Sequence, residues 1–253
     1  MGEIAIPRNI FQTWKNNDPP DHWKDSPSSI RKYMPYWNYF FFTDEDNLNF
    51  VKKHFPEYLL TYNSFPYPIQ RVDMVRVMYL YIYGGVYMDL DYAVNKPLDS
   101  LFYDKKNLYF LPSSNSPEYF TNSFMASIPK HPFWLKYLEN MTKPAPSWAI
   151  VNHLEVMFTT GPVILTKTIQ ENAPDFTKLN SEQVSPCDVS QIETCNSNSY
   201  LIILEGQSWN GWDGKLFNFL NCNFKFILWG FFLVISIVAI YYRNKYKKCK
   251  RKN

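Results

Sequence analysis

Two aspartates, Asp89 and Asp91, stand two residues apart in the segment YGGVYMDLD, directly after an apolar stretch. In an extended strand, side chains two residues apart point to the same face at a spacing of about 6.5–7 Å. Two carboxylates so close are costly to keep ionised in a cleft unless they share a cation, and divalent cations prefer oxygen ligands. The pair therefore predicts a metal site, and ligands of open α/β sheets bind beyond the carboxyl ends of strands.

Three other uses of this pair remain open. Glycoside hydrolysis also needs two carboxyl groups, but they flank the bond from opposite sides, whereas neighbours on one strand point in parallel. A metal-dependent phosphohydrolase would release inorganic phosphate from the same pair. Finally, D-x-D is a short and common string, and the two aspartates would then only begin a solvated turn before Asn95.

A helix is predicted just before this motif, over residues 70–83. Its apolar residues recur at helical spacing and would pack on a sheet: Val72, Val75, Met78, Tyr79 and Ile82. Gly84 and Gly85 end it and allow a tight entry into the next strand. On its other flank Asp73 and Arg76 project side by side. Spacing alone favours an exposed ion pair there, worth about 0.2–0.5 kcal/mol.

The elements upstream alternate between strand and helix. A first strand and its exit loop are expected over residues 4–14, a helix over 29–34, a strand over 37–44, and a helix over 44–54 capped by Thr43 or Asp44. This rhythm is typical of an α/β domain, and 253 residues allow one core of ordinary size without demanding two domains.

The charge is unevenly distributed along the chain. The formal net charge is +3, but seven of the 26 Lys and Arg residues lie in the last eleven positions, with no acidic residue among them. The remaining 19 basic and 23 acidic residues give the rest of the chain a balance of about −4. This excludes a general nucleic-acid footprint.

The segment 226–242, FILWGFFLVISIVAIYY, has seventeen residues without a charge. As a helix it would rise about 25 Å, near the lower limit for a membrane span. With its interfacial aromatics and the basic run after it, it predicts a transmembrane helix over 224–242 and a basic tail over 243–253, following an enzyme domain over 1–220. A buried core helix is the alternative. The tail favours a cytoplasmic C-terminus, but the N-terminal residues have no signal-peptide core, so the topology stays open.

The run YPIQRVDMVRVMYLYIYGGVYMDLD closely resembles the signature of the DXD-motif glycosyltransferases of the initiating α-1,6-mannosyltransferase type. IPRNIFQTW, WNYFFFTDED, NSFMASIPKHPFW, TTGPVILT and GQSWNGWDGKL follow the family's order over residues 6 to about 216. Among these enzymes the chain looks most like the catalytic subunits of inositol phosphoceramide mannosyltransferase. The resemblance implies an α/β GT-A fold, the Rossmann-like fold of nucleotide-diphospho-sugar transferases.

The resemblance also implies roles for individual residues. Catalytic positions are Asp89, Asp91 and Arg76. Positions that bind the nucleotide sugar are Gln12, Trp14, Asp73, Arg76, Asp89, Asn122, Ser208 and Trp209. Metal positions are Asp89, Asp91 and Asn210, although the family has His where this chain has Asn210, and an amide is a poorer ligand than imidazole. Asp213 is an alternative third ligand, and Gly161-Pro162 resembles a turn that could face phosphate or simply cap a helix.

The function so implied is a metal-dependent, retaining hexosyl transfer from a nucleotide sugar. The cofactor is Mn²⁺ or Mg²⁺, and the donor is most consistent with GDP-mannose, with UDP-galactose and UDP-N-acetylglucosamine as alternatives. The acceptor is a membrane-associated sphingolipid or glycan, so the partners are the bilayer and a small membrane regulatory subunit, with no nucleic acid, in an ER or Golgi type endomembrane. A catalytically impaired sugar- or nucleotide-binding membrane protein remains open because of Asn210.

Overall fold

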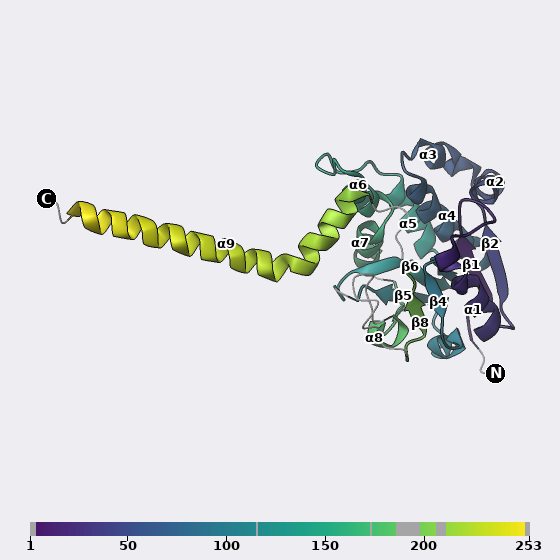
Figure 1. Ribbon diagram of the computed structural model, residues 1–253. Helices are drawn as coiled ribbons and strands as arrows, with labels where there is room; N and C mark the ends of the chain where they lie inside the picture. Colours follow the sequence, from purple (N-terminus) through teal and green to yellow (C-terminus); the bar gives the residue numbers. More distant parts are fainter. Residues whose placement is uncertain (1–3, 115, 173, 186–197, 206–210, 251–253) are drawn as a thin grey trace. The chain divides into compact units, whose positions relative to one another are not determined.

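A six-stranded mixed sheet with the strand order β2-β1-β3-β6-β5-β7 forms the centre of the computed structural model (Figure 1). β1 runs parallel to β2 and β3, β6 is antiparallel to β3 and β5, and β7 is parallel to β5. The strands are β1 (Asn9–Thr13), β2 (Asn38–Phe42), β3 (Gly85–Met88), β5 (Leu108–Pro112), β6 (Phe120–Ser127) and β7 (Thr177–Lys178). β4 (Tyr92–Val94) and β8 (Leu201–Ile203) form a separate antiparallel pair.

The structure describes residues 4–114, 116–172, 174–185, 198–205 and 211–250. It divides into two compact units, Met1–Trp209 and Asn210–Asn253. The helices of the first unit are α1 (Asp25–Tyr33), α2 (Asp44–His54), α3 (Leu59–Ser64), α4 (Pro68–Tyr83), α5 (Phe133–Met141), α6 (Asn152–Thr159), α7 (Pro162–Asn172) and α8 (Ser181–Val184), with short 3-10 helices at Asp21–Trp23, Pro56–Tyr58 and Leu98–Phe102. The expected α/β architecture is therefore present.

Strand side chains alternate between two apolar cores, one on each face of the sheet. Phe11 and Tyr87 join the core beneath α2, α4, α5 and α7, whereas Ile10, Val86 and Met88 join the core beneath α1 and the β4–β8 pair. Figure 1 shows the two groups of elements on opposite sides of the sheet. This confirms the two-residue alternation predicted for Val86–Met88, because a strand buried on both faces places successive side chains in different cores.

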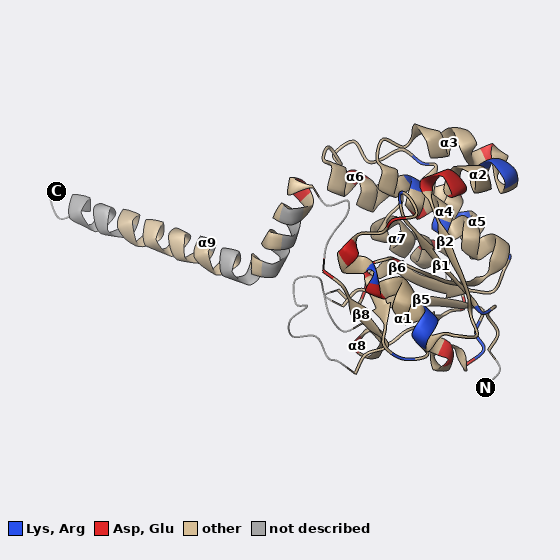
Figure 2. Ribbon diagram, turned by 45° about the vertical axis from the view of Figure 1, so that its right-hand side comes forward, with Lys and Arg blue, Asp and Glu red and all other residues tan. Residues whose placement is uncertain are grey.

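Helix α2 begins where the sequence predicts, with Thr43 as its cap. The Asp46 backbone N–H donates to the Thr43 hydroxyl (3.2 Å), and the Thr43 N–H donates to the Asp46 carboxylate (2.9 Å). Its first turn is acidic and its last turn is basic, as the red and blue ends in Figure 2 show. The capping bonds stabilise the helix because they satisfy free backbone N–H groups. The charges at its two ends stabilise it because they interact favourably with the helix dipole.

Helix α4 is the central helix of the first unit, and it is more buried than the predicted stripe requires. It starts at Pro68 and is buried all round from Asp73 to Leu80, while Val72 and Ile82 are only half-buried. The reason is that α5 and α3 cover the sides of α4 that do not face the sheet. A polar pair on the flank of α4 is consequently placed in the interior.

Gly84 and Gly85 connect α4 to β3 with φ angles of +62° and +111°. A Cβ atom on Gly85 would lie 2.4 Å from the backbone oxygen of Asn9, on the neighbouring strand β1. L-residues rarely adopt this backbone conformation. The glycines therefore let the chain turn directly from the central helix into the strand that leads to the two aspartates.

Gly85→Ala is expected to lower the free energy of unfolding by about 2–4 kcal/mol, from the positive φ and the contact with Asn9. Urea unfolding followed by tryptophan fluorescence measures this. Gly230→Ala is the control, because a Cβ there meets nothing within 4 Å and alanine suits a helix. An unchanged unfolding midpoint for Gly85→Ala would contradict the prediction.

The second unit contains α9 (Trp212–Lys250), a helix of 39 residues. The prediction that residues 224–242 form a transmembrane helix is wrong, whereas the enzyme domain over 1–220 and the basic tail over 243–253 stay predictions. Among the residues that the structure describes, no helix reaches the length and apolarity that a membrane span needs. The uncharged run of seventeen residues lies at the lower limit for a span and forms only part of a longer helix that continues on both sides of it.

Candidate active site

The two aspartates lie just beyond the end of a central strand, in a turn. β3 ends at Met88, so the predicted strand is shorter than expected, and the Tyr92 N–H donates to the Asp89 carbonyl (3.3 Å). The Asp89 N–H donates to the carbonyl of Ser123 on β6 (2.8 Å), and the Leu204 N–H donates to the carbonyl of Asp91 (2.7 Å). These bonds from three segments hold the turn at the carboxyl edge of the sheet.

Gln12, at the end of β1, also holds this turn. Its side-chain amide is fully buried and donates to the Ser26 hydroxyl (2.8 Å) and to the Asp89 carbonyl (3.1 Å), and its oxygen accepts from the Tyr39 hydroxyl (2.9 Å). The structure thus places Gln12 beside the aspartates and engages both ends of its amide with protein groups. Contact of Gln12 with a nucleotide stays a prediction.

Asp73 and Arg76 form a buried ion pair inside α4. The distance from Nη2 of Arg76 to Oδ1 of Asp73 is 3.2 Å, and their side chains are 2% and 3% exposed. Nη1 of Arg76 donates to the backbone oxygen of Asn122 (2.8 Å), and the guanidinium lies 4.5 Å from the ring centroid of Tyr87. The exposed-pair interpretation is therefore wrong, because both residues lie on the side of α4 that packs within the fold.

The same guanidinium reaches the first aspartate of the motif. Nη2 of Arg76 lies 3.2 Å from Oδ1 of Asp89, and the Tyr87 hydroxyl donates to that same oxygen at 2.8 Å. Burial raises the pKa of Asp89, and Arg76 opposes this rise. Because the contacts of Asp89 converge on one oxygen, its carboxylate is oriented by the protein while it stays 29% exposed.

Asp73 is held from two further directions. Its Oδ1 accepts from the side-chain amide of Asn122 (2.9 Å), and its Oδ2 accepts from the hydroxyl of Thr160 (2.7 Å). Burial raises the pKa of Asp73, partly offset by Arg76. Thr160 is not among the site residues that the sequence predicts, although Thr160 directly precedes Gly161-Pro162, where the sequence predicts a turn. The contacts show that this turn supports the ion pair.

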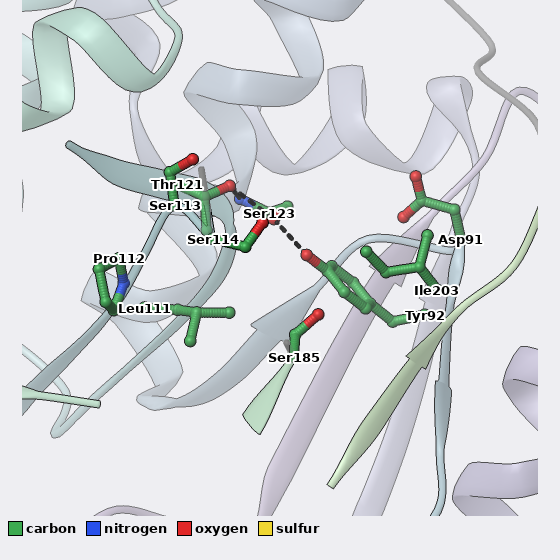
Figure 3. Close-up of a pocket in the computed structure, with 10 residues that line it drawn as sticks. All are labelled: Asp91, Tyr92, Leu111, Pro112, Ser113, Ser114, Thr121, Ser123, Ser185 and Ile203. Carbon is green, nitrogen blue, oxygen red and sulfur yellow. Dashed lines mark hydrogen bonds between the residues drawn. The ribbon is translucent and has the colours of Figure 1, made fainter. Parts of the chain in front are cut away.

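Asp91 differs from Asp89 because one of its oxygens is unsatisfied. Oδ1 of Asp91 is buried and has no hydrogen-bond partner among the residues that the structure describes. Burial, and next the nearby charge of Asp89, raise the pKa of Asp91 to about 7. The carboxylate of Asp91 lies at the edge of a pocket (Figure 3). A buried acceptor without a partner is costly, so a ligand for it is expected.

The residues present fit a divalent cation. Asp73, Asp89 and Asp91 bring three carboxylates to one region, and among the described residues the cation paired with Asp73 and Asp89 is Arg76, so the carboxylates outnumber the cations there. In the described part of the chain, however, no three His, Cys, Asp or Glu side chains are grouped as a complete metal cage. Asp89 and Asp91 would hold the ion together with groups from the donor, as is common for cations bound through phosphates.

The remaining predicted site residues are placed in part. Trp14 is half-buried just after β1, and its ring meets that of Trp23 edge to face at 5.1 Å. Asn122 is buried and lies beside Asp73 and Arg76. Asp213 is in the first turn of α9. Ser208, Trp209 and Asn210 lie outside the described residues, so their predicted roles, including a third metal ligand, stay predictions.

The chain is similar in sequence to a family of known enzymes and similar in fold to a solved structure. Residues 20–108 match the family model described as a glycosyltransferase sugar-binding region containing a DXD motif. The chain is 32% identical to inositol phosphoceramide mannosyltransferase 1 of Schizosaccharomyces pombe over 245 residues, which are 94% of this chain and 73% of that protein. It is 30% identical to the mannosyl phosphorylinositol ceramide synthase SUR1 of Saccharomyces cerevisiae, over 93% of this chain and 61% of that one.

One solved structure supports the fold. The crystal structure of mouse xyloside xylosyltransferase 1 superposes with a TM-score of 0.50 and 12% identity, covering 78% of this chain and 96% of that chain. At this identity the similarity concerns the fold alone. It supports the α/β, GT-A-like part of the architecture expected from the sequence.

Proposed function

The chain belongs to the family of glycosyltransferases whose sugar-binding region contains a DXD motif, and from this premise we propose that it is a metal-dependent, retaining mannosyltransferase. The donor is GDP-mannose and the acceptor is inositol phosphoceramide. The observation that carries the proposal is the turn Asp89–Tyr92, where a carboxylate with a buried oxygen that has no partner among the described residues stands beside a carboxylate oriented by Arg76. Such a pair can hold a cation against a diphosphate.

The protein's own residues prepare this site electrostatically. Arg76 is 2% exposed and bonded to Asp73 and Asp89, so it acts on the donor through Asp89 and through its field, not as a group open to solvent. Tyr87 donates to the carboxylate of Asp89, and Asn122 donates to that of Asp73, so both partners of Arg76 are held in position. A charge held in a dry, rigid setting stabilises charge that develops in the transition state more than the same charge in water. When bound, Mn²⁺ or Mg²⁺ supplies a Lewis acid for the leaving diphosphate.

The choice of donor and acceptor rests on the relatives. The names of the two relatives given above describe mannosyl transfer and an inositol phosphoceramide product or substrate. We extend both to this chain, together with action at the surface of an ER or Golgi type endomembrane, because the acceptor is a lipid. A small membrane regulatory subunit is part of the same proposal.

The experiment that tests the function is a donor panel with the full chain. GDP-mannose, UDP-galactose and UDP-N-acetylglucosamine are each supplied with inositol phosphoceramide in detergent, with Mn²⁺, Mg²⁺ or EDTA. With GDP-mannose we expect release of GDP and formation of a mannosylated lipid. Both products should disappear when EDTA removes the metal ion. Release of inorganic phosphate would indicate a phosphohydrolase instead. Binding of metal and nucleotide without turnover would indicate an impaired binding protein, and turnover of a UDP-sugar would replace the donor.

A further inference from the structure

A pocket of about 220 Å³ is lined by Asp91, and its described lining does not include Arg76, Asp73 or Asp89. Its floor comes from β4 and β8 through Tyr92 and Ile203, which pair with each other, and its wall comes from β5 and β6. Six of the described residues that line it carry hydroxyl groups, and Figure 3 shows them around one space: Tyr92, Ser113, Ser114, Thr121, Ser123 and Ser185. We refer to it as the hydroxyl pocket.

The chemistry of the hydroxyl pocket matches a neutral polyol. No Lys, Arg or His is among the described residues that line it, and Asp91 is its charged member. Apart from the cation proposed at Asp91, a phosphate would therefore meet a carboxylate and no basic side chain among the described lining residues. Hydroxyl groups both donate and accept, as do the hydroxyl groups of a sugar or cyclitol ring. The volume lies below the range of about 300–1,000 Å³ that is typical for drug-sized ligands, which favours a single ring.

The hydroxyl pocket is ordered by its own hydrogen bonds. The Thr121 hydroxyl lies 2.6 Å from that of Ser123, and the Ser123 hydroxyl lies 3.1 Å from that of Tyr92 (Figure 3). Ser123 is thus the central member of a chain that reaches from β6 to β4. A chain of this kind presents hydroxyl groups at set positions, which is what selective recognition of a polyol requires.

Strand β6 separates the hydroxyl pocket from the cluster proposed for the donor. Asn122 bonds to Asp73 and Arg76 on one face of the strand, whereas its neighbours Thr121 and Ser123 line the pocket on the other. The backbone oxygen of Ser123 accepts from the Asp89 N–H, so the strand is joined directly to the turn. Two polar regions of different charge therefore meet at the aspartates.

From this arrangement we propose that the hydroxyl pocket binds the neutral six-membered polyol ring of the acceptor, with a ring hydroxyl beside the turn Asp89–Tyr92. This rests on the proposed function and adds a location for the acceptor head group, an inositol ring. The phosphate of the acceptor, and the lipid attached to it, lie outside the pocket, because the described lining has no basic side chain to bind the phosphate. The ring of the donor is the competing occupant, and the experiment separates the two.

The test is Ser123→Ala in the full chain. We expect the KM for inositol phosphoceramide to rise about tenfold, as for a site that loses a hydrogen bond to a substrate hydroxyl. The KM for GDP-mannose, and the slow release of GDP without acceptor, should stay within about twofold of wild type because the bonds of Asn122, Asp73 and Arg76 are untouched. Ser28→Ala is the matched control, since Ser28 is exposed and its hydroxyl donates to the backbone oxygen of Asp25, three residues earlier. Thr121→Val repeats the test if Ser123→Ala folds poorly.

A second measurement does not depend on turnover. Saturation-transfer NMR with free myo-inositol should show binding to wild type and to Ser28→Ala, and a strongly reduced signal with Ser123→Ala. No binding by wild type would overturn the acceptor pocket even if the enzyme transfers mannose. Equal loss of donor and acceptor kinetics in Ser123→Ala would assign the pocket to the donor ring and also overturn it. Inositol binding in a chain without transferase activity would refute the proposed function and keep the pocket.

Discussion

Replacing Arg76 by methionine is expected to lower the free energy of unfolding by about 3–5 kcal/mol and to abolish sugar transfer. The guanidinium is buried and bonds to Asp73, Asp89 and the backbone oxygen of Asn122. Its removal leaves two carboxylates close together without a cation, and breaking a buried pair by removing one partner is strongly destabilising. Urea unfolding measures the first effect, and transfer of mannose to inositol phosphoceramide measures the second.

Two further variants separate charge from packing in this prediction. Arg71→Met is the matched control on the same helix: Arg71 donates to the backbone oxygen of Phe65, and its loss should cost about 1 kcal/mol with transfer retained. Arg76→Lys keeps a charge but has no planar fork to reach three acceptors, so it should fold and transfer much more slowly. Full activity of Arg76→Lys would contradict the role of the oriented guanidinium.

Asp91→Asn is expected to reduce metal-dependent transfer at least about 100-fold, because one ligand of the diphosphate-bound cation loses its charge. The side chain keeps its size, so the loss would be chemical. Transfer is measured across a Mn²⁺ titration, and binding of Mn²⁺ by electron paramagnetic resonance. Asp175→Asn is the control, since Asp175 forms an exposed pair with Lys106. Metal-dependent transfer by Asp91→Asn near the wild-type rate would refute the assignment.

Asp91→Asn, which is expected to reduce transfer, should increase the stability of the folded protein at neutral and higher pH. The pKa of Asp91 is raised from 3.8 to about 7, first by burial and next by Asp89, so the folded protein binds a proton there more readily than the unfolded chain. Stability in EDTA should therefore fall as the pH rises from about 4 to about 7, because ionised Asp91 disfavours the fold. Asp91→Asn lacks this decrease and should be the more stable protein at pH 8. Parallel wild-type and Asp91→Asn profiles would contradict the prediction.

Features set by neighbouring residues could be predicted from the sequence. The capping of α2 by Thr43, the end of α4 at Gly84 and the proximity of Asp73 to Arg76 follow from spacings of three to five residues. The position of Asp89 and Asp91 at the carboxyl end of a strand follows from the alternation before them. Local hydrogen bonds and helix or strand periodicity determine these features, and both are visible in the order of the residues.

Features set by packing were decided only by the tertiary structure. Burial of Arg76 depends on β6 and on the loop before α7, which contribute Asn122 and Thr160 from 46 and 87 residues away from their bonding partners Arg76 and Asp73. The role of Gln12 depends on Asp89, 77 residues later. The correction to the membrane helix concerns length and apolarity: the uncharged run shows that a segment is apolar, but among the described residues no helix is long and apolar enough to span a membrane.

The sequence by itself therefore determined the family, the α/β architecture and the pair of carboxylates around which the site is built. Tertiary structure decided which of their oxygens has no partner among the described residues, which charges are buried with them, and that hydroxyl groups from four separate segments form a pocket beside Asp91. The physical reason is that burial and long-range hydrogen bonds arise when strands and helices distant in the chain pack together. The spacing of residues along the chain does not show which distant residues come into contact in the folded protein.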